Sequence, residues 1–475
     1  MVEQHTQPLV SLADAERRAV SLLPPMVLGY YASGAEDETT LTDNLASWRR
    51  WRILPRVLVD VSRVDTRAAL CFFSRGGADS SFKRLLPLSA PILVAPMAMM
   101  KLAHREGEIA MARAARAAGL GMVVSTMGTT PLEEVRRGFS APPPPPPPSS
   151  SSSSPPPPSS SSSPPPPLLF QLYVTKDRAF CESLVRRAEG SGYDALVVTV
   201  DVPVLGKREA DERLGFGLPP GLELANLRGL SDSGSSSGAF SASVGAKTAA
   251  TKTAGATKAA EAPGNQSNEG SRLAALFQRQ IDASLTFDFL RWLRSRTALP
   301  IWVKGVLHPD DASAAVAAGA DGIVVSNHGG RQLDGAPAAA DVLEAVVAAV
   351  RRSPRRVRRG GGSGGGGGGR GGGGDRGPEE AVAFEAVHIP VLVDGGIRRG
   401  SDVLRALALG ADAVLLGRPA LYGLALAGER GALEVLSLLK AELERAMALS
   451  GCARVSDVSR GLLLGPGEVP MKPRL

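Results

Sequence analysis

The sequence predicts an α/β fold: a (β/α)8 TIM barrel with an N-terminal helical extension and three low-complexity insertions. Two observations carry this prediction. Short apolar runs rich in Val, Ile and Leu recur along the chain, and a stretch with helical spacing follows each of them. Continuous apolar strands that alternate with amphipathic helices are typical of a parallel sheet covered by helices, and eight such units favour a closed barrel over an open sheet.

The expected strands can be placed in chain order, and examples of the helices between them are Asp310–Ala318 and Ser401–Leu409. Their apolar residues recur at the period of a helix. The eight strands are Pro91–Ala95, Gly121–Val124, Leu169–Val174, Ala195–Val200, Ile301–Val306, Gly322–Val325, Pro390–Val393 and Ala413–Leu416.

Polar or small residues lie at the carboxyl end of each run or just after it, where active sites of this fold lie. One such Lys or Asp is as typical of a structural ion pair as of a catalyst, but such groups at every strand end favour a functional site. In strand order they are Pro96, Met97 and Ala98, then Ser125, Gln171, Tyr173, Thr199, Asp201, Lys304, His328, Arg331, Asp394, Gly395, Gly396, Gly417 and Arg418.

The most informative segment is Ser326–Gly335, a glycine-rich turn directly after an expected strand. It places an imidazole, His328, three positions before a guanidinium, Arg331. Histidine titrates near pH ~6.5, and the planar fork of arginine matches a carboxylate. The pair therefore suits proton removal beside a carboxylate. The alternative is a surface turn with an incidental histidine, which the preceding strand disfavours.

Three low-complexity segments interrupt the pattern, namely Pro142–Pro167, Ser231–Ser271 and Ser353–Gly377. We expect them to be disordered, because they cannot bury enough apolar surface to offset the entropy of ordering. The rest of the chain is expected to form one domain, so that residues 1–475 are a single domain with three insertions. The first and third lie between a helix and the next strand, hence on the amino-terminal face of the barrel. The second belongs to a long segment from Arg208 to about residue 270 that follows the fourth strand. This segment starts on the catalytic face, in the position of a lid.

The net charge of +7 does not indicate a nucleic-acid partner. Eight arginines against one aspartate between Arg351 and Gly377 account for the whole excess, and no stripe of basic and aromatic residues is present. The cysteines, Cys71, Cys181 and Cys452, are far apart and form no Cys-x-x-Cys pair. This usage favours a reducing compartment, and we expect neither a disulfide framework nor a structural metal.

No apolar run reaches the roughly 18 residues of a membrane span, and the N-terminus lacks the pattern of a signal peptide. The sequence therefore predicts a soluble, intracellular protein with no membrane partner. The last three residues, Pro473–Leu475, loosely resemble a Ser-Lys-Leu peroxisomal address. The expected location is the peroxisome or otherwise the cytoplasm.

The chain resembles the FMN-dependent 2-hydroxy-acid oxidases and dehydrogenases, a family that includes plant glycolate oxidase and bacterial lactate oxidase. The resemblance implies FMN as cofactor, oxidation of a small (S)-2-hydroxy acid (L-lactate or glycolate) to the 2-oxo acid, and a homo-oligomer, either a tetramer or an octamer. It covers nearly the whole chain outside the insertions and lies in Tyr30–Ala35, Phe170–Tyr173, Thr199–Asp201, Val303–Gly305, Ser326–Gly335 and Asp394–Gly400.

The resemblance also implies a role for each matching residue. His328 would take the substrate proton, and Asp201 would stabilise the imidazolium that results. Tyr173 would hydrogen-bond the reacting oxygen, and Lys304 would stabilise the anionic reduced flavin. The substrate carboxylate would be held by Tyr30, Arg208 and Arg331. The flavin would lie against Pro96, Met97, Ala98, Ser125, Gln171, Thr199 and Ser326, and its ribityl phosphate near Asp394, Gly395, Gly396, Arg398, Gly417 and Arg418.

Three departures from the plant glycolate-oxidase pattern bear on the substrate. Met127 stands where that pattern has tryptophan, Met97 where it has threonine, and Phe277 where it has a small aliphatic residue. Methionine is flexible and smaller than an indole, so a pocket beside the second substrate carbon would admit a methyl group, which favours lactate over glycolate. The alternative is that these residues only repack the wall.

The electron acceptor and two remoter functions stay open. A cytochrome-linked relative needs a haem domain before the barrel, whereas Tyr30 lies near the start; a membrane-bound one needs an apolar anchor, whereas Ser231–Ser271 is polar. Oxygen is therefore the expected acceptor, with hydrogen peroxide as product. The alternatives are a dehydrogenase with another acceptor, a lactate monooxygenase, a flavin isomerase without net redox chemistry, and an inert barrel whose proline blocks bind an SH3-like domain.

Overall fold

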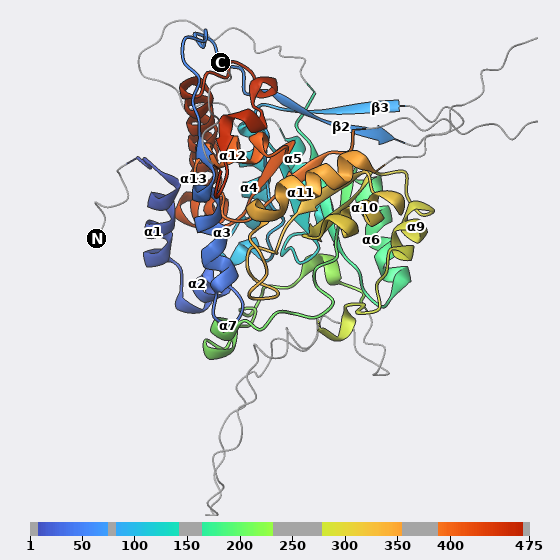
Figure 1. Cartoon of the computed structure of the whole chain (residues 1–475). Helices are drawn as coiled ribbons and strands as arrows, with labels where there is room; N and C mark the ends of the chain where they lie inside the picture. The colour runs from blue at the N-terminus through green and yellow to red at the C-terminus, as the bar shows by residue number, and fades with distance from the viewer. Residues whose placement is uncertain (1–7, 75–81, 142–163, 231–277, 354–387, 469–475) are drawn as a thin grey trace, which may run out of the picture.

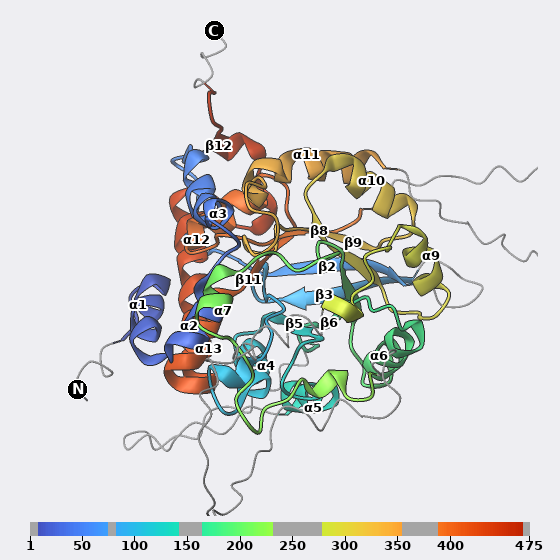
Figure 2. The same ribbon diagram turned by 90° about the horizontal axis from the view of Figure 1, so that it is seen from below.

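The structure, a computed structural model, describes residues 8–74, 82–141, 164–230, 278–353 and 388–468. Its centre is a closed barrel of eight parallel strands, in which β11 pairs back with β4 (Figures 1 and 2). All eight predicted strands are confirmed, with ends that differ by one residue at most. They are β4 (Ile92–Val94), β5 (Gly121–Ser125), β6 (Leu168–Tyr173), β7 (Ala195–Thr199), β8 (Ile301–Val306), β9 (Gly322–Val325), β10 (Val391–Val393) and β11 (Ala413–Leu416).

Helices surround the barrel, as the view along its axis in Figure 2 shows. The two helices named from the sequence are confirmed as α10 and α12, each shifted by one residue. The longest, α13, is interrupted by non-helical backbone at Ala427 and Gly428. The covering helices are α4 (Gly107–Ala117), α5 (Leu132–Ser140), α6 (Arg178–Gly190), α9 (Asp288–Arg294), α10 (Pro309–Ala317), α11 (Ala339–Arg352), α12 (Gly400–Ala408) and α13 (Arg418–Leu449).

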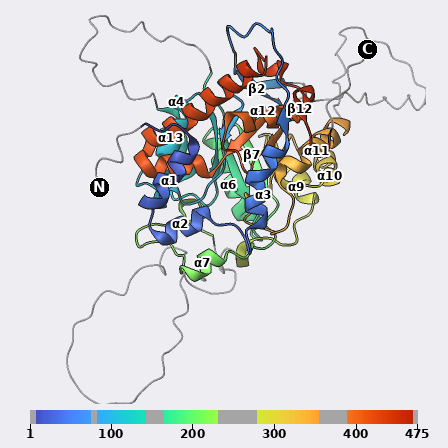
Figure 3. The same ribbon diagram turned by 60° about the vertical axis from the view of Figure 1, so that its left-hand side comes forward.

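The predicted N-terminal helical extension is confirmed as α1 (Leu12–Leu22), α2 (Pro25–Ala32) and α3 (Thr39–Arg50). Helix α1 begins at a capping box in which Ser11 and Asp14 satisfy each other's backbone amides. It packs against α13, and α3 packs against α11 and α12 (Figure 3). The extension therefore lies along the last part of the barrel.

An antiparallel hairpin, β2 (Ala68–Ser74) and β3 (Phe82–Leu88), was not predicted. In Figure 1 it lies across the end of the barrel opposite to the short helix α7 (Glu209–Arg213). Its buried Leu70, Leu86 and Leu88 join the side chains that fill the barrel interior and so close this end. The interior side chains from the strands include Leu93, Val123, Leu169, Val197, Trp302, Val324, Leu392 and Leu415.

Shorter elements complete the described chain. Strand β1 (Arg52–Ile53) pairs with β12 (Leu463–Leu464). The single-turn helices are η2 (Met100–Leu102), η3 (Ala225–Leu227), η4 (Val455–Asp457) and η5 (Arg460–Leu462). In the parts of the chain that the structure describes, no helix combines the length and apolar character needed to cross a bilayer.

The three predicted insertions fall mainly on residues 142–163, 231–277 and 354–387, which lie outside the described part of the chain. Their flanks are described. The first follows α5 and precedes β6, and the third follows α11 and precedes β10. Both flanks therefore sit at the amino ends of strands, away from the face that carries the site. The second follows β7 and η3, on the opposite face.

Candidate active site

A cavity opens at the carboxyl ends of the strands, and nearly every site residue chosen from the sequence lines it. The two exceptions, Asp201 and Ser326, lie behind it and hold lining residues in place. The predicted residues in the lining are Tyr30, Pro96, Met97, Ala98, Ser125, Met127, Gln171, Tyr173, Thr199, Lys304, Arg208, His328, Arg331, Asp394, Gly395, Gly396, Arg398, Gly417 and Arg418.

Sequence reasoning missed other lining residues, among them Tyr31, Met99, Leu205, Asp211 and Phe216. The last three come from the segment after β7, and no local pattern singles them out. The departure at Phe277 lies outside the described residues, whereas Met97 and Met127 both border the cavity.

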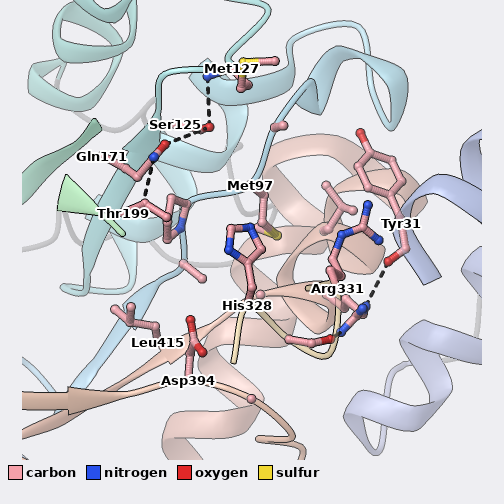
Figure 4. A pocket seen from close by; sticks show the side chains of 18 of the residues that line it. Tyr31, Met97, Ser125, Met127, Gln171, Thr199, His328, Arg331, Asp394 and Leu415 are labelled. Carbon is pink, nitrogen blue, oxygen red and sulfur yellow. Dashed lines mark hydrogen bonds between the residues drawn. The ribbon is translucent and has the colours of Figure 1, made fainter. Parts of the chain in front are cut away.

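His328 sits in a turn of left-handed backbone, with a φ of +59° followed by Gly329 at +67° and Gly330 at +74°. A Cβ on Gly330 would lie 2.7 Å from the backbone of Leu41, so only glycine fits there. The His328 amide donates to Ser326 Oγ at 3.0 Å. The glycines therefore let the chain turn sharply enough to aim the imidazole into the cavity (Figure 4).

The imidazole of His328 has a partner at each nitrogen. Nδ1 lies 2.9 Å from Asp201 Oδ1, and Nε2 lies 3.3 Å from the hydroxyl of Tyr173. Burial would raise the pKa of Asp201, but the charges of His328 and Lys304 outweigh it and lower that pKa. An ionised carboxylate only accepts, so Nδ1 carries the proton and Nε2 is the basic nitrogen. Burial lowers the pKa of His328, and Asp201 opposes this in part.

Lys304 is buried between two carboxylates. Its Nζ donates to Ser326 Oγ at 2.9 Å and lies 3.3 Å from Asp394 Oδ2. Burial would lower the pKa of Lys304, but Asp394 and Asp201 outweigh it and raise that pKa. The strand register shifts directly after Lys304, at Gly305, where a Cβ would lie 2.5 Å from the Asp201 side chain. A fixed cation is thus held in the cavity wall.

Arg331 provides a second cation beside His328, and it is partly buried. Its Nη1 donates to the carbonyls of Tyr30 at 2.6 Å and Ser33 at 2.8 Å, and its guanidinium lies 5.0 Å from the Tyr30 ring centroid. Burial lowers the pKa of Arg331 to about 9, and the charge of Arg208 acts in the same direction. Arg331 stays charged at neutral pH, and two guanidiniums in one wall favour an anionic ligand.

The loop after β10 passes close to helix α3. Gly395 and Gly396 have φ values of +97° and +77°, and a Cβ on Gly396 would lie 1.8 Å from the carbonyl oxygen of Asn44. The Asn44 side chain also exchanges amide hydrogen bonds of 2.9 and 2.8 Å with Asn327, next to His328. Asn44 therefore joins the loop that carries Gly395 and Gly396 to the loop Ser326–Gly335, called the histidine loop below. The backbone of the glycine pair, which lines the cavity just before α12, suits a phosphate.

Arg418, the first residue of α13, lines the cavity, and its guanidinium donates hydrogen bonds to backbone carbonyls. Its guanidinium donates to Tyr31 at 2.9 Å, Gly329 at 3.0 Å and Ser33 at 3.0 Å. Burial lowers the pKa of Arg418 to about 10. It therefore adds positive charge to the wall while it ties α2 to the histidine loop.

The opposite wall carries a chain of polar side chains (Figure 4). Ser125 Oγ donates to Gln171 Oε1 at 3.3 Å, and Gln171 Nε2 donates to Thr199 Oγ1 at 3.0 Å. Such a wall offers donors and acceptors to the edge of a heterocyclic ring. Pro96, Met97 and Ala98, which come from the loop after β4, border the same cavity.

Several buried polar atoms in this cavity have no hydrogen-bond partner within the described chain: Asp394 Oδ1, Arg208 Nε and Asp211 Oδ1. An unpaired buried polar atom costs about 1–3 kcal/mol, so such atoms mark a place where a ligand binds. The carboxylate oxygen suits a ribityl hydroxyl, and the glycine pair and Arg398 suit a phosphate. The residues present therefore fit FMN.

Comparisons with known proteins agree with this fit. The profile of the FMN-dependent dehydrogenase family matches residues 19–464. The chain is 40% identical to L-lactate oxidase of Nostoc sp. over 454 residues, 96% of this chain and 98% of that protein. It is 40% identical to the peroxisomal (S)-2-hydroxyacid oxidase GLO4 of Arabidopsis thaliana over 452 residues, 95% of each protein.

Solved structures give the same result. A crystal structure of mandelate oxidase superposes with a TM-score of 0.68 at 33% identity, covering 96% of this chain and 98% of that one. A soluble mutant of the membrane-associated (S)-mandelate dehydrogenase from Pseudomonas putida superposes with a TM-score of 0.68 at 33% identity, covering 96% and 99%. The chain belongs to the FMN-dependent dehydrogenase family, and FMN is its cofactor.

Proposed function

We propose that this protein oxidises a small (S)-2-hydroxy acid, L-lactate or glycolate, to the 2-oxo acid and passes the electrons to O2, which forms hydrogen peroxide. The observation that carries the proposal is the partly buried Asp201–His328 pair, with an Nδ1 to Oδ1 distance of 2.9 Å, beside the cation of Arg331. A base and an anion clamp at one cavity match a substrate whose reacting carbon is attached to a carboxylate.

The chain's own residues then have distinct tasks. Arg331, Arg208 and Tyr30 bind the substrate carboxylate and so set the orientation of the reacting carbon. His328 Nε2 removes a proton, and Asp201 stabilises the charge that the ring gains. Tyr173, whose pKa is raised by burial, stays protonated and donates a hydrogen bond to the reacting oxygen. Closeness of these groups in a buried cavity makes each interaction stronger than it is in water.

FMN, when bound, supplies an acceptor for the electron pair that leaves the substrate. Gly395, Gly396 and Arg398 would hold its phosphate, with the charge of Arg418 nearby. Asp394 would accept from the ribityl chain, and Lys304 would offset negative charge on the reduced ring. The remaining contacts would come from Pro96, Met97, Ala98, Ser125, Gln171, Thr199, Ser326 and Gly417.

Several properties expected from the sequence stay predictions. We propose that residues 1–475 form one domain, and that the protein assembles as a tetramer or octamer and carries no metal. Its location in the peroxisome or cytoplasm is likewise a prediction, and Pro473–Leu475 lies outside the described residues. A dehydrogenase with another acceptor and a lactate monooxygenase share the same first half-reaction, so they differ only in how the flavin is reoxidised.

Anaerobic mixing tests the function directly. The purified protein is mixed with L-lactate, glycolate or a longer 2-hydroxy acid, and the flavin absorbance is followed; air is then admitted. We expect bleaching by a short (S)-2-hydroxy acid and rapid recovery in air, with equal amounts of 2-oxo acid and peroxide. Slow recovery in air would indicate a dehydrogenase. Release of a decarboxylated acid without peroxide would indicate a monooxygenase, and no bleaching at all would refute the proposal.

The substrate side chain is expected to contact Met127, which is 7% exposed in the cavity wall. If methionine leaves room that an indole would fill, L-lactate should have a higher kcat/KM than glycolate, and Met127→Trp should narrow or reverse that preference. One methyl group in an apolar pocket changes the ratio by about 10- to 200-fold. Steady-state kinetics on both acids measures it.

The control for Met127→Trp is Met97→Leu, because Met97 lines the same cavity. Met111 would not serve, since it is fully buried and does not line the cavity. Leucine has a volume close to that of methionine. The ratio of kcat/KM for L-lactate to kcat/KM for glycolate should therefore stay near that of the unaltered protein. A native preference for glycolate that Met127→Trp leaves unchanged would show that Met127 does not set the choice between the two acids. The proposed flavin chemistry would be unaffected.

A further inference from the structure

The two loops that carry the proposed catalytic groups come from strands that are not neighbours. Asp201 and Arg208 follow β7, whereas His328 and Arg331 follow β9, and β8 lies between these strands. No ladder of backbone hydrogen bonds therefore joins the ends of β7 and β9. The 2.9 Å contact between Asp201 and His328 needs another means of holding the loops together.

Gln332 supplies such a connection with its side-chain amide. Nε2 donates to the carbonyl of Asp201 at 2.8 Å and to the carbonyl of Val204 at 2.8 Å. Oε1 accepts from the amide of Gly206 at 3.1 Å. The amide thus binds the loop after β7 at three positions, from a residue adjacent to Arg331. Because Nε2 faces two carbonyls and Oε1 faces an N–H, only one orientation of the amide fits.

Gly206 brings the two backbones into direct contact at the same place. A Cβ on Gly206 would lie 2.5 Å from the carbonyl oxygen of Arg331 and 2.6 Å from that of Gln332. Distances below 3.0 Å to backbone atoms cannot be relieved by a side-chain movement. The amide hydrogen bonds of Gln332 therefore depend on the absence of a side chain at position 206.

We propose that Gln332 and Gly206 form a clasp between the two loops, and that Gln332 is a positioning residue that keeps Asp201 against His328 and Arg208 beside Arg331. This inference rests on the proposed function. Gln332 touches neither the reacting atoms nor the cofactor cavity in the described chain, since it is not among the lining residues. It acts through the loop after β7, which carries Asp201 and Arg208, and through Arg331, which precedes it in the chain.

Other contacts hold the same loop to the rest of the molecule. The amide of Leu205 donates to Gln278 Oε1 at 2.7 Å, and the amide of Glu36 donates to the carbonyl of Lys207 at 2.9 Å. The ring of Phe216 stacks on Tyr30 with centroids 4.1 Å apart. Loss of the Gln332 bonds should therefore misalign the two loops by a small amount without unfolding the loop after β7.

The test is Gln332→Met, which keeps the volume of the side chain and removes its donors and acceptor. Because these hydrogen bonds hold the two loops in register, we expect flavin reduction by the 2-hydroxy acid to slow on the order of 10-fold. The acid limb of the pH profile should move to lower pH, because His328 loses part of the support of Asp201. Oxalate, a small carboxylate with no C–H bond to oxidise, should bind on the order of 10-fold more weakly.

Two matched variants and a control separate positioning from a general loss of stability. Gly206→Ala should reproduce the Gln332→Met defects by forcing the loops apart. Gln278→Met makes the same substitution at a residue that holds the same loop through the amide of Leu205, so the acid limb should stay in place. Leu333→Ala removes a neighbouring side chain that is 73% exposed, and native rates are expected.

FMN content and melting temperature are measured for every variant. Native rates, pH profile and oxalate affinity in Gln332→Met would overturn the proposal. A loss of rate or of oxalate affinity that is proportional to the loss of FMN or to the fall in melting temperature would also overturn it, because that pattern belongs to a structural role. Oxalate binding is read from the flavin spectrum without turnover. The clasp is thus tested even if no 2-hydroxy acid bleaches the native flavin, a result that would refute the proposed function alone.

Discussion

Replacing His328 with glutamine or alanine is expected to slow flavin reduction by about 10²- to 10⁴-fold, the usual contribution of a positioned base, while FMN stays bound. The imidazole is held from both sides, by Asp201 at 2.9 Å and Tyr173 at 3.3 Å. Burial lowers the pKa of His328, so the ring is the neutral base at pH 7. For the same reason, kcat/KM should fall as the pH is lowered through that pKa, because a protonated ring accepts no proton.

Rapid mixing with substrate under anaerobic conditions measures the rate, and the flavin spectrum reports FMN content. The chain offers a matched control in His388, whose Nε2 lies 2.7 Å from Asp412 Oδ1 but which is half exposed and distant from the cavity lining. His388→Gln removes the imidazole of a second histidine–aspartate pair, and native reduction is expected. Near-native reduction in both His328 variants would remove His328 from the mechanism.

Gly396→Ala is expected to weaken FMN binding on the order of 10²- to 10³-fold. Its φ of +77° is unfavourable for an L residue, and its new Cβ would lie 1.8 Å from the carbonyl oxygen of Asn44. Left-handed backbone costs about 1–2 kcal/mol and forced overpacking about 1–3 kcal/mol. The loop can relieve the contact only by moving, which takes its amides away from the phosphate position.

The matched control is Gly335→Ala. Gly335 has a φ of +81°, close to that of Gly396, but a Cβ there would meet nothing within 4 Å. The substitution therefore adds backbone strain without a collision, and FMN affinity should be unchanged. Titration of the apoproteins with FMN, followed by quenching of flavin fluorescence, gives both dissociation constants. Equal affinities for Gly396→Ala and the native protein would show that this loop does not bind the phosphate.

The sequence was sufficient to locate the barrel because parallel strands buried on both faces are continuous apolar runs, such as Gly322–Val325. It was sufficient for most of the cavity lining because the lining follows those runs directly. The hairpin β2–β3 escaped prediction because two antiparallel strands at the barrel's end carry no periodicity that distinguishes them from the strands of the wall. Its function as a closure depends on contacts such as Leu70 with the barrel interior, which no local pattern encodes.

Asp211 and Phe216 were missed for a related reason. They belong to a short helix and the turn after it, and neither follows a strand end directly. Their place in the cavity is set by packing across the chain, with Phe216 against Tyr30 and Leu214 against Gly29. Contacts between segments almost 200 positions apart are a property of the folded chain and not of any local sequence window.

The bonds from Arg331 and Arg418 to the carbonyls of Tyr30, Tyr31 and Ser33 have a consequence for biosynthesis. Helix α2 leaves the ribosome long before its partners in the site do, and α1 packs on α13, the last of the covering helices. Arg331 leaves the ribosome before α13 does, but Arg418, the first residue of α13, can reach its acceptors only after the last strand of the barrel, β11, has been made. Cofactor uptake is therefore expected only after translation is nearly complete, and ribosome-stalled chains that lack α13 should not retain FMN.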